Sequence, residues 1–276
     1  MTQITAAEVN KLRQQTGAGM MDCKKALVES NGDFEKAIEI LRKKGQKLAS
    51  SRADRAANEG VVLAKVNNDA TTASIIMLNC ETDFVAKNQE IIDFTKRILD
   101  LAVENNIATL EDLLEADMGG RKVSDSITDM IGKTGEKLEL SRFSAIKGES
   151  AVAYIHPGNR VASIAAFNQA NVEEQVGKDV VMQIAAMAPV AIDKDDVEQK
   201  IIDQEIEIGK DQARQEGKPE ELVEKIAIGK LNKFFKENTL LNQEFIKDGK
   251  KSVGQMLDSA SKGLTVIAFK RFVLGS

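Results

Sequence analysis

The sequence predicts an α+β protein, with small antiparallel sheets and helices that occupy separate stretches of the chain. Two observations carry this prediction. Runs rich in Val, Ile and Thr occur in pairs that are joined by turn residues, as at 61–66 and 73–78 around Asn67-Asn68-Asp69. Stretches before and after these runs instead place apolar residues at three- and four-residue spacing, which is typical of helices. At 276 residues the chain is long enough for about two domains, each with its own core.

Composition excludes several classes of protein. The formal net charge is −5, which argues against a dedicated nucleic-acid binder. No apolar run approaches the ~20 residues that cross a bilayer, so no membrane contact is expected. Met1-Thr2-Gln3-Ile4 lacks a basic segment followed by an apolar one, so we expect no secretory signal and a cytoplasmic protein. Cys23 and Cys80 are then expected to be reduced, packed thiols.

Residues 1–55 are expected to form an N-terminal domain of three short helices followed by a basic linker. Thr5 and Glu8 have the spacing of a capping box for the first helix, and a glycine-rich break ends it. A second helix follows over 20–29, and Asp33 is placed to cap the third. Three helices in this order resemble a bundle of the ubiquitin-associated type.

Two features of this domain point to a partner. Met20 and Met21 are adjacent, so both cannot face the core of one helix. We expect one of them to be exposed as an adaptable contact, and a partly buried pair at the helix start is the alternative. A basic run follows, and it is interpreted as a solvated helix or linker, with contact to RNA or to an acidic partner as the alternative. The run comprises Arg42, Lys43, Lys44, Lys47, Arg52 and Arg55.

Residues 56–140 are expected to form a second domain, in which a β-hairpin is followed by a helix. Thr82 or Asp83 is predicted to cap this helix, since a short side-chain oxygen can accept a free N–H of the first turn. Capping alone is one interpretation of the stretch. The other starts from Phe84, because an exposed aromatic beside a carboxylate is suited to insertion into a partner. The apolar positions of the helix are Ile91, Ile92, Phe94, Ile98, Leu99, Ala102 and Val103.

The same domain should contain two further helices, near 109–114 and 124–131, and a strand from Leu138. Gly132-Lys133-Thr134 imitates the end of a phosphate-binding P-loop. That motif needs a glycine where this chain has Ile127, and the imitation does not follow a strand. No direct nucleotide binding and no cofactor are therefore expected.

Residues 141–276 are expected to form a third domain with strands at 151–155, 161–167 and 263–274, and a helix over 172–188. Two amphipathic helices separated by Gly217-Lys218-Pro219 should form a helical hairpin inserted at about 190–238. We expect this hairpin to protrude as a contact arm for a second copy or for a partner. A hairpin that packs on its own domain is the alternative.

No catalytic group is visible in the sequence. His156 is the only histidine, so a multi-histidine metal site is excluded. It lies in a predicted turn without an adjacent acid, and the carboxylates are dispersed over helix faces. These features favour a binding protein over an enzyme.

Two motifs resemble the signatures of the bacterial elongation factor Ts family. They are LRQQTGAGMMDCKKAL at 12–27 and TDFVAKN at 82–88. The resemblance implies a guanine-nucleotide exchange factor for the GTPase elongation factor Tu. It implies that Thr82, Asp83, Phe84 and Val85 dislodge the partner's Mg²⁺, and that Arg13, Met20, Met21 and His156 bind the partner. It also implies a coiled-coil arm where the helical hairpin is expected, and self-association is expected to use that hairpin.

The runner-up function is a non-enzymatic scaffold that binds protein or RNA through the N-terminal helices and the basic run. Salt dependence separates the two functions. Binding to phosphates should collapse between low and moderate salt, whereas a protein contact anchored by apolar side chains should not.

Overall fold

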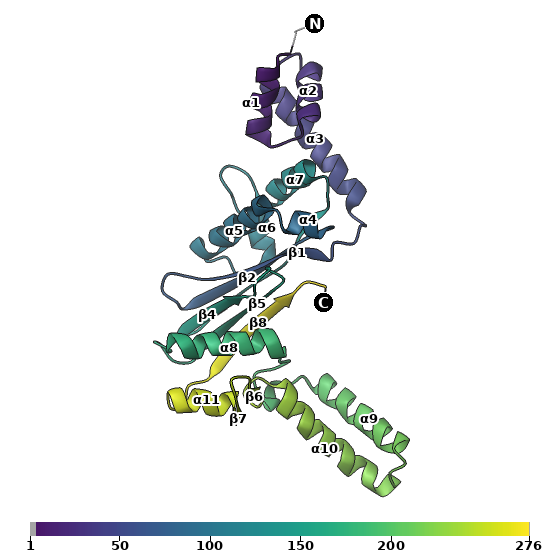
Figure 1. Ribbon diagram of the computed structural model, residues 1–276, viewed down its shortest axis with the longest axis vertical. Helices are drawn as coiled ribbons and strands as arrows, with labels where there is room; N and C mark the ends of the chain where they lie inside the picture. Colours follow the sequence, from purple (N-terminus) through teal and green to yellow (C-terminus); the bar gives the residue numbers. More distant parts are fainter. Residues whose placement is uncertain (1–3, 276) are drawn as a thin grey trace. The chain divides into compact units, whose positions relative to one another are not determined.

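The computed structural model describes residues 4–275 and shows a mixed α+β fold (Figure 1). N-terminal helices are followed by small sheets interspersed with helices, and one pair of helices packs together, which confirms the predicted fold class. Met1–Gln3, on which the expected absence of a secretory signal depends, lie outside the described residues. Within residues 4–275, no helix combines the length and the apolar character needed to cross a membrane.

The described chain divides into two compact units. The first unit contains the residues up to 63, residues 76–144 and the residues from 273 on, and the second contains residues 64–75 and 145–272. The predicted domain boundaries at 55/56 and 140/141 stay predictions. The second of them falls within a strand, since β3 extends over Leu138–Lys147.

Three helices open the first unit: α1 (Ala6–Thr16), α2 (Met20–Glu29) and α3 (Phe34–Arg52). The predicted capping box is present, because Thr5 N donates to Glu8 Oε2 at 2.8 Å and Glu8 N donates to Thr5 Oγ1 at 3.3 Å. Gly17 ends α1 with a φ of 67°, and Asp33 caps α3. The three helices enclose a core of Val9, Leu12, Cys23, Ala26, Leu27 and Ala37.

The third helix is longer than its apolar pattern indicates and crosses α7 (Val123–Thr134) closely. At the crossing, a Cβ placed on Gly132 would lie 3.2 Å from the Cα of Gly45. Two glycines therefore let the helix backbones approach one another. This packing explains Gly132 of the P-loop imitation, which lies inside a helix.

The first sheet has the strand order β1 (Glu59–Val66), β2 (Thr72–Cys80), β3. The turn that joins β1 to β2 is closed by Asn67, whose N donates to Thr72 O at 2.9 Å and whose Oδ1 accepts the N–H groups of Thr71 and Thr72. A connection this short joins antiparallel strands, as predicted, because a parallel pair needs a long crossover.

Two short helices, α4 (Asp83–Ala86) and α6 (Leu110–Glu115), flank α5 (Gln89–Glu104). The apolar stripe of α5 is buried at Ile91, Phe94, Ile98, Leu99 and Ala102, as its spacing predicts. The prediction that Thr82 or Asp83 caps this long helix is wrong. Thr82 caps only α4, and Asn88 caps α5 by accepting the N–H of Glu90 at 3.0 Å. Asn88 is extended, with φ −68° and ψ 123°, and this separates the two helices.

The second unit is built on the sheet order β4 (Ser150–Ile155), β5 (Val161–Phe167), β8 (Val266–Val273). β4 and β5 are antiparallel, in a register that runs from Ser150 opposite Phe167 to Ile155 opposite Ala162. Their apolar side chains share a core with α8 (Glu174–Met187) and α11 (Val253–Ala260). Neither α11 nor the small sheet of β6 (Glu244–Phe245) and β7 (Asp248–Ser252) was predicted, because α11 is short and charged residues obscure any alternation in β7.

The predicted helical hairpin is present as α9 (Gln199–Gln215) and α10 (Glu220–Asn238), which lie side by side after a 3₁₀ turn, η1 (Lys194–Asp196) (Figure 1). The helices approach most closely at Gly209, where a Cβ would lie 3.0 Å from the Cα of Ala227. Arg214 pairs with Glu220 at 2.8 Å across the connection. Ile208, Leu222 and Ile228 remain exposed.

Two glycines of the hairpin should respond oppositely to alanine. Gly229→Ala adds a Cβ with no heavy atom within 4 Å, so better helix propensity should stabilise α10 by about 0.5–1 kcal/mol. Gly209→Ala presses on the backbone of α10, and we expect overpacking to outweigh that gain and leave a net loss of about 1 kcal/mol. Hydrogen exchange of the α9 and α10 amides measures both local stabilities. Equal shifts in the two variants would contradict the close helix contact at residue 209.

Candidate partner-binding site

The turn at residues 82–85 follows β2, and its last three residues already belong to α4. Thr82 is extended, with φ −124° and ψ 154°, and its Oγ1 accepts the N–H of Val85 at 3.4 Å. The predicted change from strand to helix therefore occurs at this place. Asp83 and Phe84 follow as the first two residues of a helix that spans only Asp83–Ala86 and buries no side chain.

Phe84 is the most exposed large apolar side chain among the described residues, with 82% of its surface accessible. The neighbouring Val85 is half-buried. An aromatic ring left in water gains free energy when a partner covers it, and buried aromatic anchors dominate many interfaces. The exposure predicted for Phe84 is confirmed, and the ring is free to enter an apolar pocket of another protein.

Asp83 presents a carboxylate beside this ring. Its Oδ2 lies 2.7 Å from Lys87 Nζ, and this hydrogen bond lowers the pKa of Asp83 below its usual value. The pair is open to solvent, with side-chain exposures of 45% for Asp83 and 78% for Lys87. An exposed ion pair contributes little free energy, so Asp83 can exchange Lys87 for a donor on a partner at small cost.

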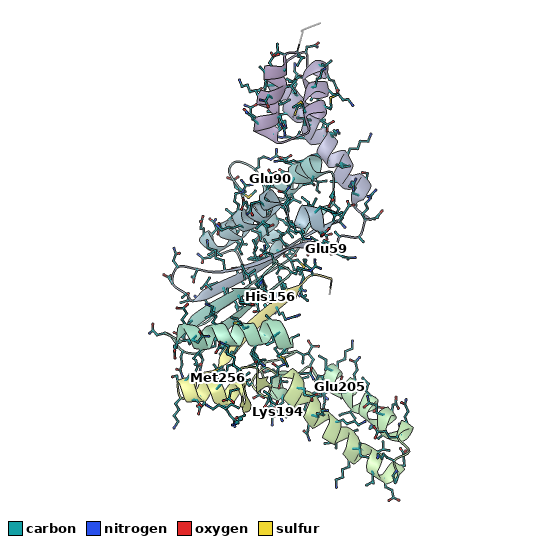
Figure 2. All side chains as sticks on the ribbon, in the orientation of Figure 1. Glu59, Glu90, His156, Lys194, Glu205 and Met256 are labelled. Atoms are coloured by element: carbon teal, nitrogen blue, oxygen red, sulfur yellow. The ribbon has the colours of Figure 1, made fainter. Side chains whose placement is uncertain are left out.

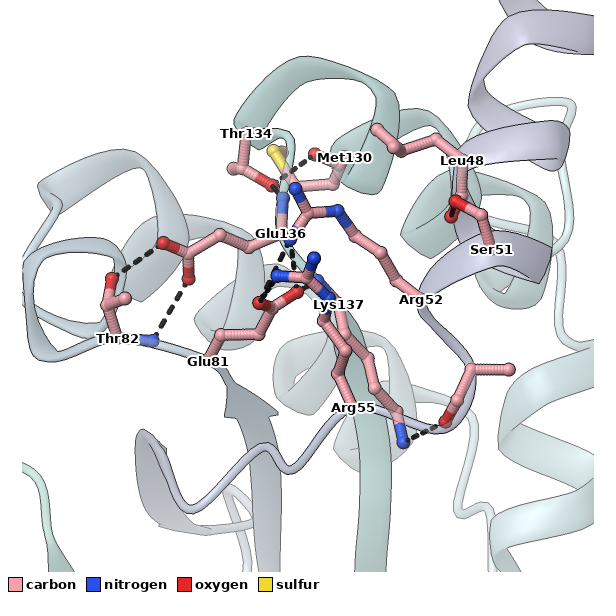
Figure 3. A network of polar contacts seen from close by, with 11 residues as sticks. Leu48, Ser51, Arg52, Arg55, Glu81, Thr82, Met130, Thr134, Glu136 and Lys137 are labelled. Atoms are coloured by element: carbon pink, nitrogen blue, oxygen red, sulfur yellow. Dashed lines mark hydrogen bonds and ion pairs between the residues drawn. The ribbon is translucent and has the colours of Figure 1, made fainter.

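A network of hydrogen bonds and ion pairs holds Glu81 and Thr82, at the start of the turn, in place (Figure 3). Glu136 accepts two hydrogen bonds from Thr82, one from N at 3.0 Å and one from Oγ1 at 2.7 Å. Glu81 accepts from Arg52 Nη1 at 2.7 Å, from Arg55 Nη1 at 3.1 Å and from the backbone N of Lys137 at 2.7 Å. These bonds, first of all the one from Lys137 N, lower the pKa of Glu81 to about 2. This network could not be predicted from the sequence, since its charged members are scattered along the chain.

The end of β2 that supports the turn lies against β1, with little space between the two strands. A Cβ on Gly60 would lie 2.2 Å from the carbonyl oxygen of Leu78, and Asn79 Nδ2 donates to Glu59 O at 3.3 Å. The thiol of Cys80 donates to Thr82 O at 3.1 Å, and burial raises its pKa to about 12. Cys80 is therefore a packed, protonated thiol and not a nucleophile.

Arg13, Met20 and Met21 lie on the N-terminal helices of the same unit. Arg13 is exposed, and both methionines are exposed, Met20 at 55% and Met21 at 63%. One of the two methionines was predicted to be exposed, and the structure exposes both. Neither belongs to the core of these helices, in which Cys23 is the first residue of α2.

More side chains of the basic run form ion pairs with acidic residues than the sequence indicates. Lys43 pairs with Glu39 and Lys44 with Asp22, and the side chain of Arg52 is only 23% exposed beside Glu81. The interpretation of a solvated helix holds for Lys43 and is wrong for Arg52. Paired cations are less available to phosphates, which weakens the alternative of an RNA contact.

His156 belongs to the second unit and stands at the turn between β4 and β5 (Figure 2). It is exposed, and its N donates to Val161 O at 2.9 Å. Its Nδ1 lies 2.9 Å from the hydroxyl oxygen of Tyr154, a contact that was not predicted. Residues i and i+2 of a strand share a face, so this spacing was a usable signal.

The predicted site residues thus fall into three groups. Thr82–Val85 form one continuous turn, Arg13, Met20 and Met21 lie on α1 and α2, and His156 lies in the other unit. Their roles in partner binding stay predictions, as does self-association through the helical hairpin. In the described part of the chain, no group of three or more His, Cys, Asp or Glu side chains is placed to hold a metal ion.

Comparisons with known proteins agree on one family. Residues 81–276 match the family model described as elongation factor TS. The chain is 53% identical over 274 residues to the elongation factor Ts of Porphyromonas gingivalis, covering 99% of each chain. It is 51% identical over 277 residues to that of Cytophaga hutchinsonii, covering 99% of this chain and all of the relative. With the relative from Christiangramia forsetii it shares 50% identity over the full length of both chains.

Proposed function

Because this chain belongs to the elongation factor Ts family, the nucleotide exchange factors for elongation factor Tu in translation elongation, we propose that Asp83 and Phe84 carry its exchange activity. The protein is an exchange factor and not a catalytic enzyme. The observation that carries the proposal is the 82% exposure of Phe84 on a turn that is capped and anchored. A ring held out in this way is ready to enter a partner without prior rearrangement.

The target of the ring follows from how a GTPase holds its nucleotide. The phosphates of GDP are bound by P-loop amides and by a Mg²⁺ ion that also contacts protein oxygens. Phe84 enters the apolar layer beneath the metal and shifts the elements that carry its ligands. Asp83 competes for hydrogen bonds beside the metal-bound water. Once the ion has left, the phosphate charge is poorly neutralised, and GDP dissociates.

The remaining predicted contacts support this step. Arg13, Met20 and Met21 anchor the N-terminal helices to the GTPase domain, where flexible methionines adapt to the partner surface. His156 contacts the side of the P-loop. Thr82 and Val85 hold the two ends of the inserted turn. The N-terminal helices act as a bundle of the ubiquitin-associated type. The helices α9 and α10 form the coiled-coil arm through which copies of the protein associate. The protein works in the cytoplasm.

Exchange by this route has no intrinsic direction. If the factor lowers the affinity of the partner for nucleotide, the nucleotide lowers the affinity for the factor by the same ratio. The supply of GTP over GDP then decides which nucleotide rebinds.

Release of a fluorescent GDP from purified elongation factor Tu tests the proposal. At millimolar Mg²⁺ the protein should accelerate release strongly. When a chelator has first removed Mg²⁺, we expect the acceleration to shrink by about tenfold or more, because the metal contact that the factor disrupts no longer contributes. Elongation factor Tu alone, with and without chelator, is the control. An unchanged acceleration would contradict displacement of the metal.

A further inference from the structure

The helix that carries Phe84 cannot hold its own position. α4 contains four residues, and none of them is buried. A single helical turn is unstable in water, because fixing its backbone costs more than its few hydrogen bonds return. Core packing therefore does not set the direction in which Phe84 points. That direction has to come from bonds at the ends of the turn.

Glu136 provides such bonds at the N-terminal end. Its Oε1 accepts the hydroxyl of Thr82 at 2.7 Å, and its Oε2 accepts the backbone N–H of Thr82 at 3.0 Å. Two bonds from one carboxylate to one residue restrict rotation as well as translation. The same hydroxyl oxygen accepts the N–H of Val85 at 3.4 Å, so the capping bond of α4 is itself oriented by Glu136.

Glu81 fixes the preceding residue in the same way. It receives Arg52 Nη1 and the backbone N of Lys137, and its side chain is only 13% exposed. Residues 81 and 82 are thus bonded to residues 137 and 136, which are likewise consecutive. Lys137 Nζ also donates to Ala53 O at 2.8 Å, immediately after the last residue of α3. The network joins the end of α3, the turn and the start of β3 within the first unit (Figure 3).

We propose that Glu136 and Glu81 are positioning residues for nucleotide exchange, which hold the turn so that Phe84 and Asp83 enter the partner pre-oriented. This inference rests on the proposed function of Phe84. It adds that the activity of the ring depends on two carboxylates that need not touch the partner.

A double-mutant cycle on GDP release from elongation factor Tu tests the proposal. Glu136→Ala should lower the maximal release rate by about ten- to a hundredfold, because small misplacement of a reactive group is costly. In an Asp83→Ala/Phe84→Ala background the same change should have no further effect, because both groups that it would misplace are already absent. Glu115→Ala is the matched control. It removes an exposed carboxylate paired with Lys122 in the same unit and should leave the release rate unchanged in both backgrounds.

A second pair of variants tests the same positioning role if Glu136→Ala fails to fold. Thr82→Ser keeps both bonds to Glu136 and the cap of α4 and should exchange like the wild type, whereas Thr82→Val loses the hydroxyl bond to Glu136 together with the cap that it orients and should lose rate. Equal effects of Glu136→Ala in the wild-type and Asp83→Ala/Phe84→Ala backgrounds, or equal rates for the two Thr82 variants, would overturn the positioning role. If Phe84→Ala alone exchanges like the wild type, the proposed function itself fails, which is a different result.

Discussion

Replacing Phe84 by alanine is expected to remove most of the acceleration of GDP release from elongation factor Tu. Truncation of a central aromatic anchor typically costs about 2–4 kcal/mol, which corresponds to roughly 30- to 1000-fold in rate if the contact is made only during exchange. The fold should not change. The ring is 82% exposed and lies outside the core, so the free energy of unfolding should stay within about 0.5 kcal/mol. Stopped-flow release of fluorescent GDP and urea unfolding measure the two quantities.

The control for this variant is Ile246→Ala. Ile246 is also a large apolar residue with substantial exposure, 45%, but it lies outside every predicted contact group. Its loss should change neither the release rate nor the free energy of unfolding appreciably. A rate for Phe84→Ala equal to that of Ile246→Ala would show that the ring has no part in exchange.

The second large effect concerns stability. Gly60→Ala should destabilise the first unit by about 2–6 kcal/mol, from roughly 1–3 kcal/mol of overpacking and 1–3 kcal/mol of backbone strain. The added Cβ would lie 2.2 Å from Leu78 O and 2.8 Å from Asn79 Cα, and both neighbours are backbone atoms. Gly60 also has a φ of 152°, which a residue with a side chain rarely adopts. Urea unfolding followed by circular dichroism measures the loss.

Gly119→Ala separates the two contributions. Gly119 has a φ of 77°, but a Cβ there meets no heavy atom within 4 Å. This variant should show the backbone strain alone, about 1–2 kcal/mol. If Gly60→Ala costs no more than Gly119→Ala, the close approach of β1 to the end of β2 is not real, and the support described for the turn loses its basis.

The features that the sequence predicted correctly are local ones. Thr5 and Glu8 meet because three residues of helix bring them together, and Asn67 closes its hairpin through bonds to residues four and five positions away. The stripe of α5 follows from helical spacing alone. The exposure of Phe84 also follows from a local pattern, an aromatic on a turn between strand and helix. The capping rule failed where the sequence offers more than one capping residue, since Asn88 and not Thr82 caps α5.

By itself, then, the sequence determined the class of fold, the order of most of its elements, the family and the turn at 82–85, because each depends on spacing over a few residues. Only the tertiary structure decided what holds that turn. Glu136 lies 54 positions from Thr82, and Arg52 lies 29 positions from Glu81. No pattern in the sequence couples such distant charges. They meet only because the first sheet brings the end of β2 next to the start of β3, with the end of α3 beside them.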